Sequence, residues 1–433
     1  MADEHGRMNK LEAENERLKN AVEELSIIND ISTAINSTLS LEKIIELIVQ
    51  KCIKHMKVEQ GTVTLLENGG QDNQFKTIMR GADQSSGYLP FHLDTQITGW
   101  MLKNKKPLII DDLDSDDRFR TLESEENPIK TLLSVPLILK GRIIGSLNVF
   151  NKHGADNFSE TDKRLLCIIS TQSAQVIENA RLYEEEQSLM RIQEEMKIAY
   201  NIQMGLLPKG APIIEGYDVA GKSMPAKSVG GDYFDLIRLC DGRLFFCLGD
   251  ISGKGMPAAL LMSNMLATLR GQNLDITTPG PILNHSNEHM FRNTDPERFS
   301  TLFLGVLDPG TSELIYSNAG HNLPFIVRGS GDVERLETGN LVLGAIEDVT
   351  YTEDSVKLAV GDTLIIFSDG ISEAINPDEE EFGEDPLPGI ISANRDASAM
   401  ALIDTVIDLV VRHAGKAPQR DDMTMVVIRR TGV

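Results

Sequence analysis

The sequence predicts an α+β protein with more than one domain. Its 433 residues exceed what one hydrophobic core usually holds together. The apolar pattern also changes along the chain. Residues 24–180 follow a helix–sheet–helix order, residues 181–208 carry a heptad repeat, and residues 209–433 contain many short strands. A further heptad stripe occupies residues 1–23, so we expect two folded domains and two coiled-coil helices.

The two heptad stripes predict helices that pair with a second copy of the chain. The first stripe consists of Met8, Leu11, Leu18, Val22 and Leu25, with Asn15 in the remaining place. The second consists of Leu182, Leu189, Ile192, Met196 and Ala199, with Glu185 in one place. Pro208 ends the second helix because proline cannot continue it. The pattern favours a homodimer, although a solvated single helix is the alternative for the short first stripe.

Residues 24–180 predict one sensor-like α+β domain. We expect an amphipathic helix at 41–55, a strand at 61–66, paired strands at 131–139 and 142–150, and a closing helix at 160–180. The short Lys140-Gly141 connection between the paired strands predicts a hairpin turn.

Residues 209–433 predict a sheet-rich domain covered by helices. We expect strands at 244–249, 300–307, 314–318, 363–367 and 423–428. Long helices are expected at 257–270 and 397–412, and Pro257 suits the first turn of its helix.

Composition excludes several classes of partner. The net charge of −23 disfavours binding to nucleic acid or to an anionic membrane surface. No apolar run is long enough to cross a bilayer, and the polar N-terminal segment has no signal-peptide pattern. The four cysteines form no CxxC pair and lie in apolar surroundings, which indicates buried thiols in a reducing compartment. We therefore expect a cytoplasmic protein.

Aspartates recur beside glycines at the predicted strand ends of the last domain. They are Asp232, Asp250, Asp369 and the pair Asp421-Asp422. One such aspartate is usually a turn residue, but four similar settings in one domain predict a carboxylate site. Oxygen ligands suit Mg²⁺ or Mn²⁺, and no Cys or His cluster competes for a different metal. Spacing alone leaves a phosphatase, a nuclease and a nucleotidyl cyclase open.

Five ordered motifs narrow this choice. They are Val-Gly-Gly-Asp-Tyr-Phe-Asp (229–235), Gly-Asp-Ile-Ser-Gly-Lys-Gly (249–255), Asn-Ala-Gly-His-Asn (318–322), Phe-Ser-Asp-Gly (367–370) and Asp-Asp-Met-Thr (421–424). Together they resemble the PPM-type serine/threonine phosphatases of the SpoIIE/RsbU group. The helix containing Ile202-Gln203 resembles the one that leads into that catalytic domain. The resemblance implies a β-sandwich flanked by helices.

The resemblance also implies a role for each motif residue. Asp250 would bridge two Mn²⁺ or Mg²⁺ ions, and the Ile251 carbonyl would bind one of them. Asp369 and Asp421 would bind the second ion, and Asp232 would act beside them through a bound water. A water activated by both ions would attack phosphoserine or phosphothreonine of a protein, such as an anti-sigma-factor antagonist. His321 is interpreted as a structural residue of its turn, not as a general acid.

The segment 24–180 resembles a GAF domain. The resemblance lies in Ser-Val-Pro-Leu (134–137), Gly-Ser-Leu (145–147) and the spacing of Asn151, Lys152, Phe158 and Asp162. Cyclic-nucleotide-binding GAF domains carry a similar pattern, but Lys163 replaces their final Glu. The resemblance implies a small-molecule ligand, and it predicts an ion pair between Lys152 and Asp162.

Two other functions stay open at the level of the sequence. Gly230-Gly231-Asp232 is similar to a motif of diguanylate cyclases, but Tyr233-Phe234 follows where those enzymes continue with Glu-Phe. A catalytically weak phosphatase fold that serves as a signalling scaffold is the second alternative.

Overall fold

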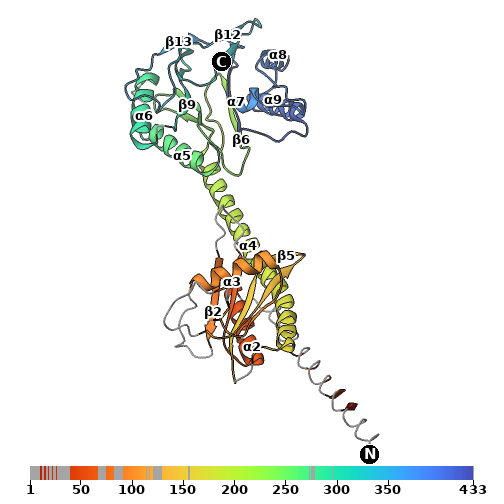
Figure 1. Cartoon of the computed structure of the whole chain (residues 1–433). Coiled ribbons are helices and arrows are strands. Elements are labelled where there is room, and N and C mark those ends of the chain that lie inside the picture. Colours follow the sequence, from red (N-terminus) through yellow and green to blue (C-terminus); the bar gives the residue numbers. More distant parts are fainter. Residues whose placement is uncertain are drawn as a thin grey trace, which may run out of the picture. The chain divides into compact units, whose positions relative to one another are not determined.

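The computed structural model describes residues 40–432 apart from 67–74, 82–90, 114, 117, 120–128, 155–156, 273, 275–277 and 296 (Figure 1). Before residue 40 it describes scattered helical positions only, so the first predicted coiled coil lies mostly outside the described residues. Leu11, Leu18 and Val22 of that stripe are exposed. The chain divides into two compact units, residues 1–191 and 192–433.

The first unit is built around one antiparallel five-stranded sheet. Its strand order is β2-β1-β5-β4-β3. The strands are β1 (Val58–Leu66), β2 (Phe75–Gly81), β3 (Leu108–Ile110), β4 (Leu132–Leu139) and β5 (Arg142–Lys152). The helices are α2 (Leu41–Met56), α3 (Phe91–Asn104) and the first part of α4 (Glu160–Leu206).

The predicted hairpin and the helix–sheet–helix order of this unit are confirmed. Lys140 and Gly141 both have positive φ, as a tight two-residue turn between β4 and β5 requires. Ile45 and Val49 of α2 and Ile169 of α4 are buried in one apolar cluster with Val135 and Leu147 of the sheet. Gly145 has to be glycine because a Cβ there would lie 2.2 Å from the carbonyl oxygen of Thr64.

The second unit is a sandwich of two antiparallel five-stranded sheets. One sheet has the order β13-β10-β9-β8-β7, and the other has the order β12-β11-β14-β15-β6. The strands are β6 (Tyr217–Met224), β7 (Tyr233–Arg238), β8 (Leu244–Ile251), β9 (Ser300–Asp308), β10 (Glu313–Ala319), β11 (Phe325–Val327), β12 (Val333–Arg335), β13 (Asp354–Lys357), β14 (Thr363–Phe367) and β15 (Met423–Arg430). All five strands that the sequence predicts in this region are present.

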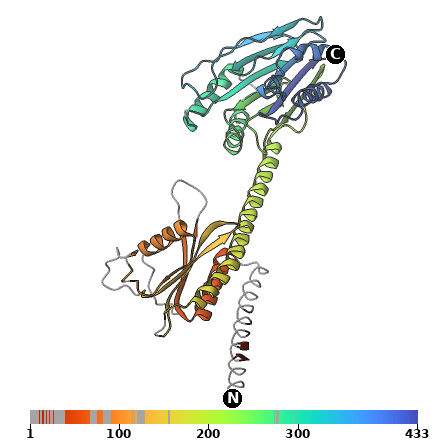
Figure 2. The same ribbon diagram turned by 45° about the vertical axis from the view of Figure 1, so that its right-hand side comes forward.

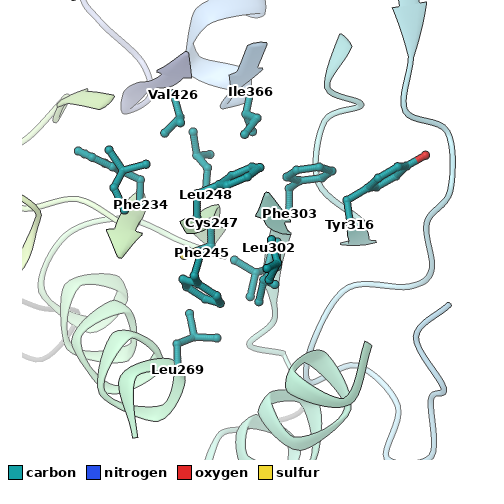
Figure 3. Close-up of a cluster of buried hydrophobic side chains, with 14 of the residues drawn as sticks. Phe234, Phe245, Cys247, Leu248, Leu269, Leu302, Phe303, Tyr316, Ile366 and Val426 are labelled. Atoms are coloured by element: carbon teal, nitrogen blue, oxygen red, sulfur yellow. The ribbon is translucent and has the colours of Figure 1, made fainter. Parts of the chain in front are cut away.

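Apolar side chains of both sheets meet inside the sandwich. Phe234, Leu248 and Phe303 of the first sheet share a buried cluster with Ile366 and Val426 of the second (Figure 3). This mutual burial fixes the sheets face to face, since each sheet has one apolar side to remove from water.

Helices cover the outer faces of the sandwich (Figure 2). Helices α5 (Met256–Arg270) and α6 (Pro279–Asn293) pack on the first sheet. Helices α7 (Asp369–Ser372), α8 (Pro386–Ala393) and α9 (Ala399–Ala414) lie on the side of the second sheet. Ser398 caps α9 by accepting a hydrogen bond from the Ala401 amide. Helices α6, α7 and α8 are absent from the sequence-based prediction.

Helix α4 begins in the first unit and ends in the second. Leu182, Leu189 and Ile192 of the predicted stripe are exposed on it. This exposure leaves an apolar edge free to pair, and the coiled coil itself stays a prediction. No helix in the described part of the chain is both long and apolar enough to span a bilayer.

The expectation of four buried thiols is partly wrong. None of the four cysteines forms a disulfide with the described residues; Cys52 and Cys247 are buried, and Cys167 is half-buried. Cys240 is exposed because it lies in the turn between β7 and β8, at the edge of the core.

Candidate functional site

The aspartates that the sequence singles out come together where strands of both sheets end. Asp250 lies near the end of β8, Asp232 precedes β7, and Asp369 begins α7. Asp421 and Asp422 directly precede β15. The charges of Asp369, Asp421 and Asp422 each raise the pKa of Asp250, which requires that these carboxylates lie close to one another.

The Asp250 carboxyl group is the centre of this cluster. Burial is the largest cause of its raised pKa, followed by the charge of Asp369, and together these effects bring the pKa to about 7. Asp369 also has a raised pKa, first through burial and then through the charge of Asp421. Repulsion of this kind is relieved when a cation enters the cluster.

Asp232 is the more deeply buried of the two aspartates predicted to be catalytic, Asp232 and Asp250. Its side chain is 4% exposed, and its Oδ2 has no hydrogen-bond partner among the described residues. Burial, followed by the charge of Asp250, raises the pKa of Asp232 well above its usual range. A buried carboxylate oxygen without a partner is costly, so this atom is suited to bind a water or another donor.

Gly231 keeps an open space between Asp250 and Ile251. A Cβ at this position would lie 2.8 Å from Asp250 Oδ1 and 2.8 Å from the Ile251 carbonyl oxygen. Both oxygens therefore face the same small gap, as the resemblance implies for two ligands of one ion. The Ile251 side chain is fully buried, which fixes its backbone at this place.

Asp422 organises the glycine loop instead of facing the gap. Its Oδ1 accepts a hydrogen bond from the Ala226 amide at 2.8 Å. Its Oδ2 accepts from the Gly231 amide at 2.7 Å and from the Asp232 amide at 3.4 Å. These bonds occupy both oxygens of Asp422, whereas Asp421 accepts from the Asp422 amide through Oδ1 at 2.9 Å and meets Lys254 through Oδ2.

Asp421 is held by Lys254, which is not among the site residues predicted from the sequence. Lys254 Nζ lies 2.5 Å from Asp421 Oδ2 and donates to the Arg420 carbonyl oxygen at 2.7 Å. The sequence does contain an indication of this role, because Lys254 stands between two glycines in the motif 249–255. Among the described residues, no group of three or more His, Cys, Asp or Glu side chains is arranged to hold a metal ion.

Gln203 is a second residue whose role the sequence did not reveal. It is 3% exposed and lies near the end of α4. Its Nε2 donates to the Gly230 carbonyl oxygen at 2.6 Å, and its Oε1 accepts from the Gly230 amide at 3.1 Å. The final turn of α4 is thereby attached to the loop that carries Asp232.

His321 has the structural surroundings that the sequence analysis expects. Its amide donates to Asn318 Oδ1 at 2.8 Å, and its Nδ1 lies 2.9 Å from Thr301 Oγ1. Burial lowers the pKa of His321 to about 4. The ring is therefore neutral at pH 7 and has no imidazolium proton to donate.

The predicted ion pair of the first unit is confirmed. Lys152 Nζ lies 2.5 Å from Asp162 Oδ2, which also accepts from the Ser159 amide and hydroxyl, each at 2.7 Å. A cavity of about 280 Å³ in this unit is lined by residues of β1, of the β4–β5 hairpin and of α4, and it does not include the pair. The pair therefore fixes the start of α4 and has no contact with that cavity.

Comparison with known proteins gives two family matches. The family "Stage II sporulation protein E (SpoIIE)" matches residues 240–431, and "GAF domain" matches residues 38–178. The phosphoserine phosphatase RsbU of Bacillus subtilis is 31% identical over 254 residues, which cover 57% of this chain and 75% of RsbU.

Two further proteins are similar to parts of the chain. Protein IcfG of Synechocystis is 28% identical over 291 residues, which cover 59% of this chain and 46% of IcfG, so the match spans less than half of that relative. The solved SiaA-PP2C domain of Pseudomonas aeruginosa superposes with a TM-score of 0.50 at 21% identity. The superposition covers 56% of this chain and 98% of the SiaA domain, and it supports the expected sandwich fold.

Proposed function

Because the chain belongs to the RsbU and SpoIIE family of PP2C-type serine phosphatases and carries a GAF domain, we propose that it is a divalent-metal-dependent phosphatase of phosphorylated proteins. The observation that carries this proposal is the carboxylate cluster around Asp250, whose pKa is raised by burial and by its acidic neighbours. A cluster of this kind, open beside a glycine loop, is suited to cations that in turn hold a phosphoryl group.

The donor set fits Mg²⁺ or Mn²⁺. Asp250 and the Ile251 carbonyl face one gap, and Asp369 and Asp421 would hold a second ion, with Asp232 nearby. Mg²⁺ needs only one or two carboxylates and usually keeps several waters in proteins, so a small donor set of this kind suffices. When bound, two such ions would neutralise the phosphoryl group and acidify a water molecule.

The chain's own residues position the reacting groups. Asp422 and Gln203 hold the 230–232 loop from two sides through its backbone. Asp232 Oδ2 has no hydrogen-bond partner in the described part of the chain and can accept a hydrogen bond or a proton from a water in the gap. Lys254 places a positive charge beside Asp421, where an ion has to compete with it.

The test is release of phosphate from a phosphoserine peptide in the presence of Mn²⁺. Asp250→Asn and Asp369→Asn should each lower the rate at least ~100-fold while the circular dichroism spectrum is retained. The matched control is Asp408→Asn, which removes an exposed aspartate of α9 and should keep full activity. Full activity in either cluster variant would contradict the proposal.

A signalling scaffold is the alternative function, and two observations favour it. Lys254 already neutralises Asp421, and three grouped metal ligands are missing from the described residues. Calorimetric titration with Mn²⁺ separates the two functions, because a scaffold needs no metal. A nucleotide cyclase is tested by incubation with GTP followed by chromatography.

The substrate and the regulation belong to the same proposal. We infer a cytoplasmic homodimer that acts on a phosphorylated protein, such as an anti-sigma-factor antagonist, under control of a small molecule bound by the GAF domain. Helix α4 contributes residues to both units, and Gln203 in its last turn is bonded to the loop that carries Asp232. Insertion of a few residues after Glu186 would rotate one unit about this helix. Unchanged basal and stimulated activity would show that the helix does not transmit the signal.

A further inference from the structure

Arg429 of β15 is a buried guanidinium that lacks a carboxylate hydrogen bond among the described residues. Its side chain is 6% exposed. Its Nε donates to Thr363 Oγ1 at 3.2 Å, and its Nη1 donates to the carbonyl oxygens of Arg395 and Ala397. Its Nη2 has no partner in the part of the chain that the structure describes. Two donor hydrogens on a buried charged group are therefore unsatisfied, which is costly.

This guanidinium lines a cavity of about 640 Å³. The cavity lies between the ends of β14 and β15 and the connection from α8 to α9. It is lined by four arginines and by two aspartates. The arginines are Arg328, Arg395, Arg429 and Arg430, and the aspartates are Asp218 and Asp396. A cavity with a surplus of positive charge is unexpected on a chain whose net charge is −23.

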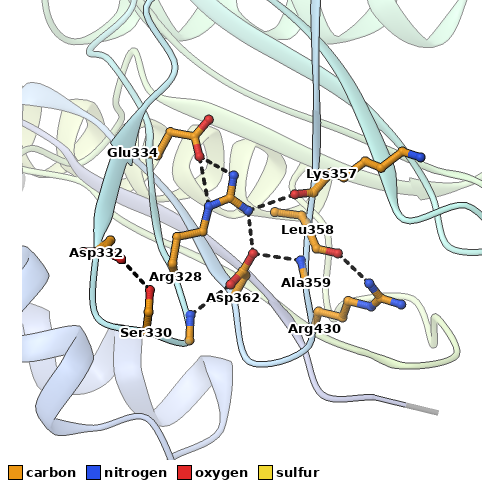
Figure 4. A network of polar contacts seen from close by, with 10 residues as sticks. Arg328, Ser330, Asp332, Glu334, Lys357, Leu358, Ala359, Asp362 and Arg430 are labelled. Atoms are coloured by element: carbon orange, nitrogen blue, oxygen red, sulfur yellow. Dashed lines mark hydrogen bonds and ion pairs between the residues drawn. The ribbon is translucent and has the colours of Figure 1, made fainter.

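Figure 4 shows the partners of two of the four arginines, of which Arg328 is neutralised by carboxylates. Arg328 forms ion pairs with Asp362 and Glu334 and also donates to the Lys357 carbonyl oxygen. Arg430 donates to the Leu358 carbonyl oxygen. Arg395 Nε likewise donates to the Ser392 carbonyl oxygen at 3.2 Å, and Arg395, Arg429 and Arg430 form no ion pair with the described residues. Arg395 and Arg429 flank the same α8–α9 connection, since Arg429 bonds the Arg395 carbonyl oxygen.

The two aspartates compensate for Arg429 only in part. The carboxylate of Asp218 accepts a hydrogen bond from the Ala399 amide at 2.7 Å, and Asp396 is exposed. Burial outweighs both of these charges and lowers the pKa of Arg429. An anion hydrogen-bonded to Nη2 would supply the missing partner and charge.

We propose that this cavity binds the phosphate group of a small molecule, with Arg429 Nη2 and the Arg395 guanidinium as its donors. The volume lies within the range of small-molecule sites, about 300 to 1,000 Å³, and exceeds the needs of a single phosphate ion. Apolar side chains of Val327, Val360 and Ile391 also line it and suit the remainder of a phosphate ester.

The site is separate from the carboxylate cluster. Asp422 precedes the first residue of β15 and Arg429 is close to its last, seven residues apart, or about 23 Å at 3.3 Å per residue. A ligand here does not occupy the proposed catalytic gap, so the inference stands whether or not the proposed activity is correct.

Calorimetry with the full chain tests the proposal. EDTA is added so that no metal draws phosphate to the carboxylate cluster. The probes are inorganic phosphate, AMP and adenosine, which separate a free anion from a phosphate ester and from the nucleoside alone. We expect binding of AMP or of phosphate and none of adenosine. The absence of heat with both phosphate probes would overturn the proposal, as would equal binding of adenosine and AMP.

Two exposed positions give variants with opposite effects. Arg395→Ala should weaken binding at least ~3-fold, because it removes one of the donors. Asp396→Asn should tighten it ~2- to 5-fold, because it removes a repelling charge. The matched controls are Arg292→Ala and Glu288→Gln on α6, which make the same types of change on an exposed ion pair. Unchanged affinity in both cavity variants would refute the site.

Arg429 is tested by Arg429→Lys, which keeps the charge but cannot reproduce the guanidinium fork. We expect a loss of at least ~5-fold in phosphate affinity, with the unfolding temperature monitored in parallel. If Arg429→Lys fails to fold, the opposite effects of Arg395→Ala and Asp396→Asn still decide the proposal.

Discussion

Gln203 and Gly230 form a reciprocal pair in which the side-chain amide of one bonds both backbone groups of the other. The pair joins the end of α4 to the loop of Asp232, and it is buried. The glutamine amide thus satisfies the backbone N–H and C=O of Gly230 in the way a neighbouring strand would. Loss of the pair would leave an N–H and a C=O without partners in the interior.

Gln203→Met should therefore displace the loop that carries Asp232 while the domain stays folded. Two unpaired buried backbone groups cost about 1 to 3 kcal/mol each, and the loop can relieve this cost by moving away from Asp250. We expect Mn²⁺-dependent phosphatase activity to fall ~10-fold or more. The control is Gln193→Met, an exposed glutamine of the same helix. Equal activity of the two variants would show that the pair does not position the loop.

Gly231→Ala should block the gap between Asp250 and Ile251. The added Cβ would lie 2.8 Å from an oxygen of each residue, closer than real Cβ contacts allow. Calorimetry with Mn²⁺ should show affinity weakened at least ~10-fold, which is typical when a group that positions the metal ligands is changed. Gly205→Ala is the control, because a Cβ there meets no atom within 4 Å. Wild-type Mn²⁺ affinity in Gly231→Ala would place the ions elsewhere.

Lys254→Met should tighten divalent metal binding. The lysine forms an ion pair with Asp421, so an ion at that carboxylate has to displace an ammonium group. An exposed pair of this kind contributes up to about 1 kcal/mol, so the dissociation constant for Mn²⁺ should fall up to ~5-fold. Lys222→Met removes a comparable exposed pair with Asp404 and should leave metal affinity unchanged. Weaker binding in Lys254→Met would mean that the lysine supports the site and does not compete for it.

Because His321 is buried as a neutral ring, we expect the free energy of unfolding to fall in mild acid. Its pKa is about 4 in the folded protein because of burial, and about 6.5 in the unfolded chain. A depressed pKa contributes stability above pH 6.5 that is lost as the pH falls toward 4. Between pH 7 and pH 5 the loss from this group is about 2 kcal/mol.

The measurement is denaturant unfolding at both pH values. His321→Gln should lose about 2 kcal/mol less stability between pH 7 and pH 5 than the wild type does. His285→Gln, at an exposed histidine of α6, is the control and should follow the wild type. Parallel pH profiles for the wild type and His321→Gln would contradict the prediction.

Local chemistry explains the elements that could be predicted from the sequence. The apolar runs of β8, β9, β14 and β15 are long enough to be recognised, and Lys140-Gly141 permits the positive φ of a tight turn. Helix α6 was missed because its first residues, Pro279-Gly280-Pro281, have the composition of a loop. Its buried face becomes apparent only when it packs on β9 and β10.

The sequence by itself determined the two folded units, the helix between them and the recurrence of aspartate beside glycine at strand ends. Only the tertiary structure decided what each polar residue contacts. Asp422 accepts a hydrogen bond from an amide 191 residues away in the sequence, and Gln203 accepts one from an amide 27 residues away. Lys254 donates to a carbonyl oxygen 166 residues away. The unsatisfied guanidinium of Arg429 likewise depends on how β15 meets the α8–α9 connection. Periodicity reports which face of an element is buried, whereas such contacts depend on how separate elements pack in three dimensions.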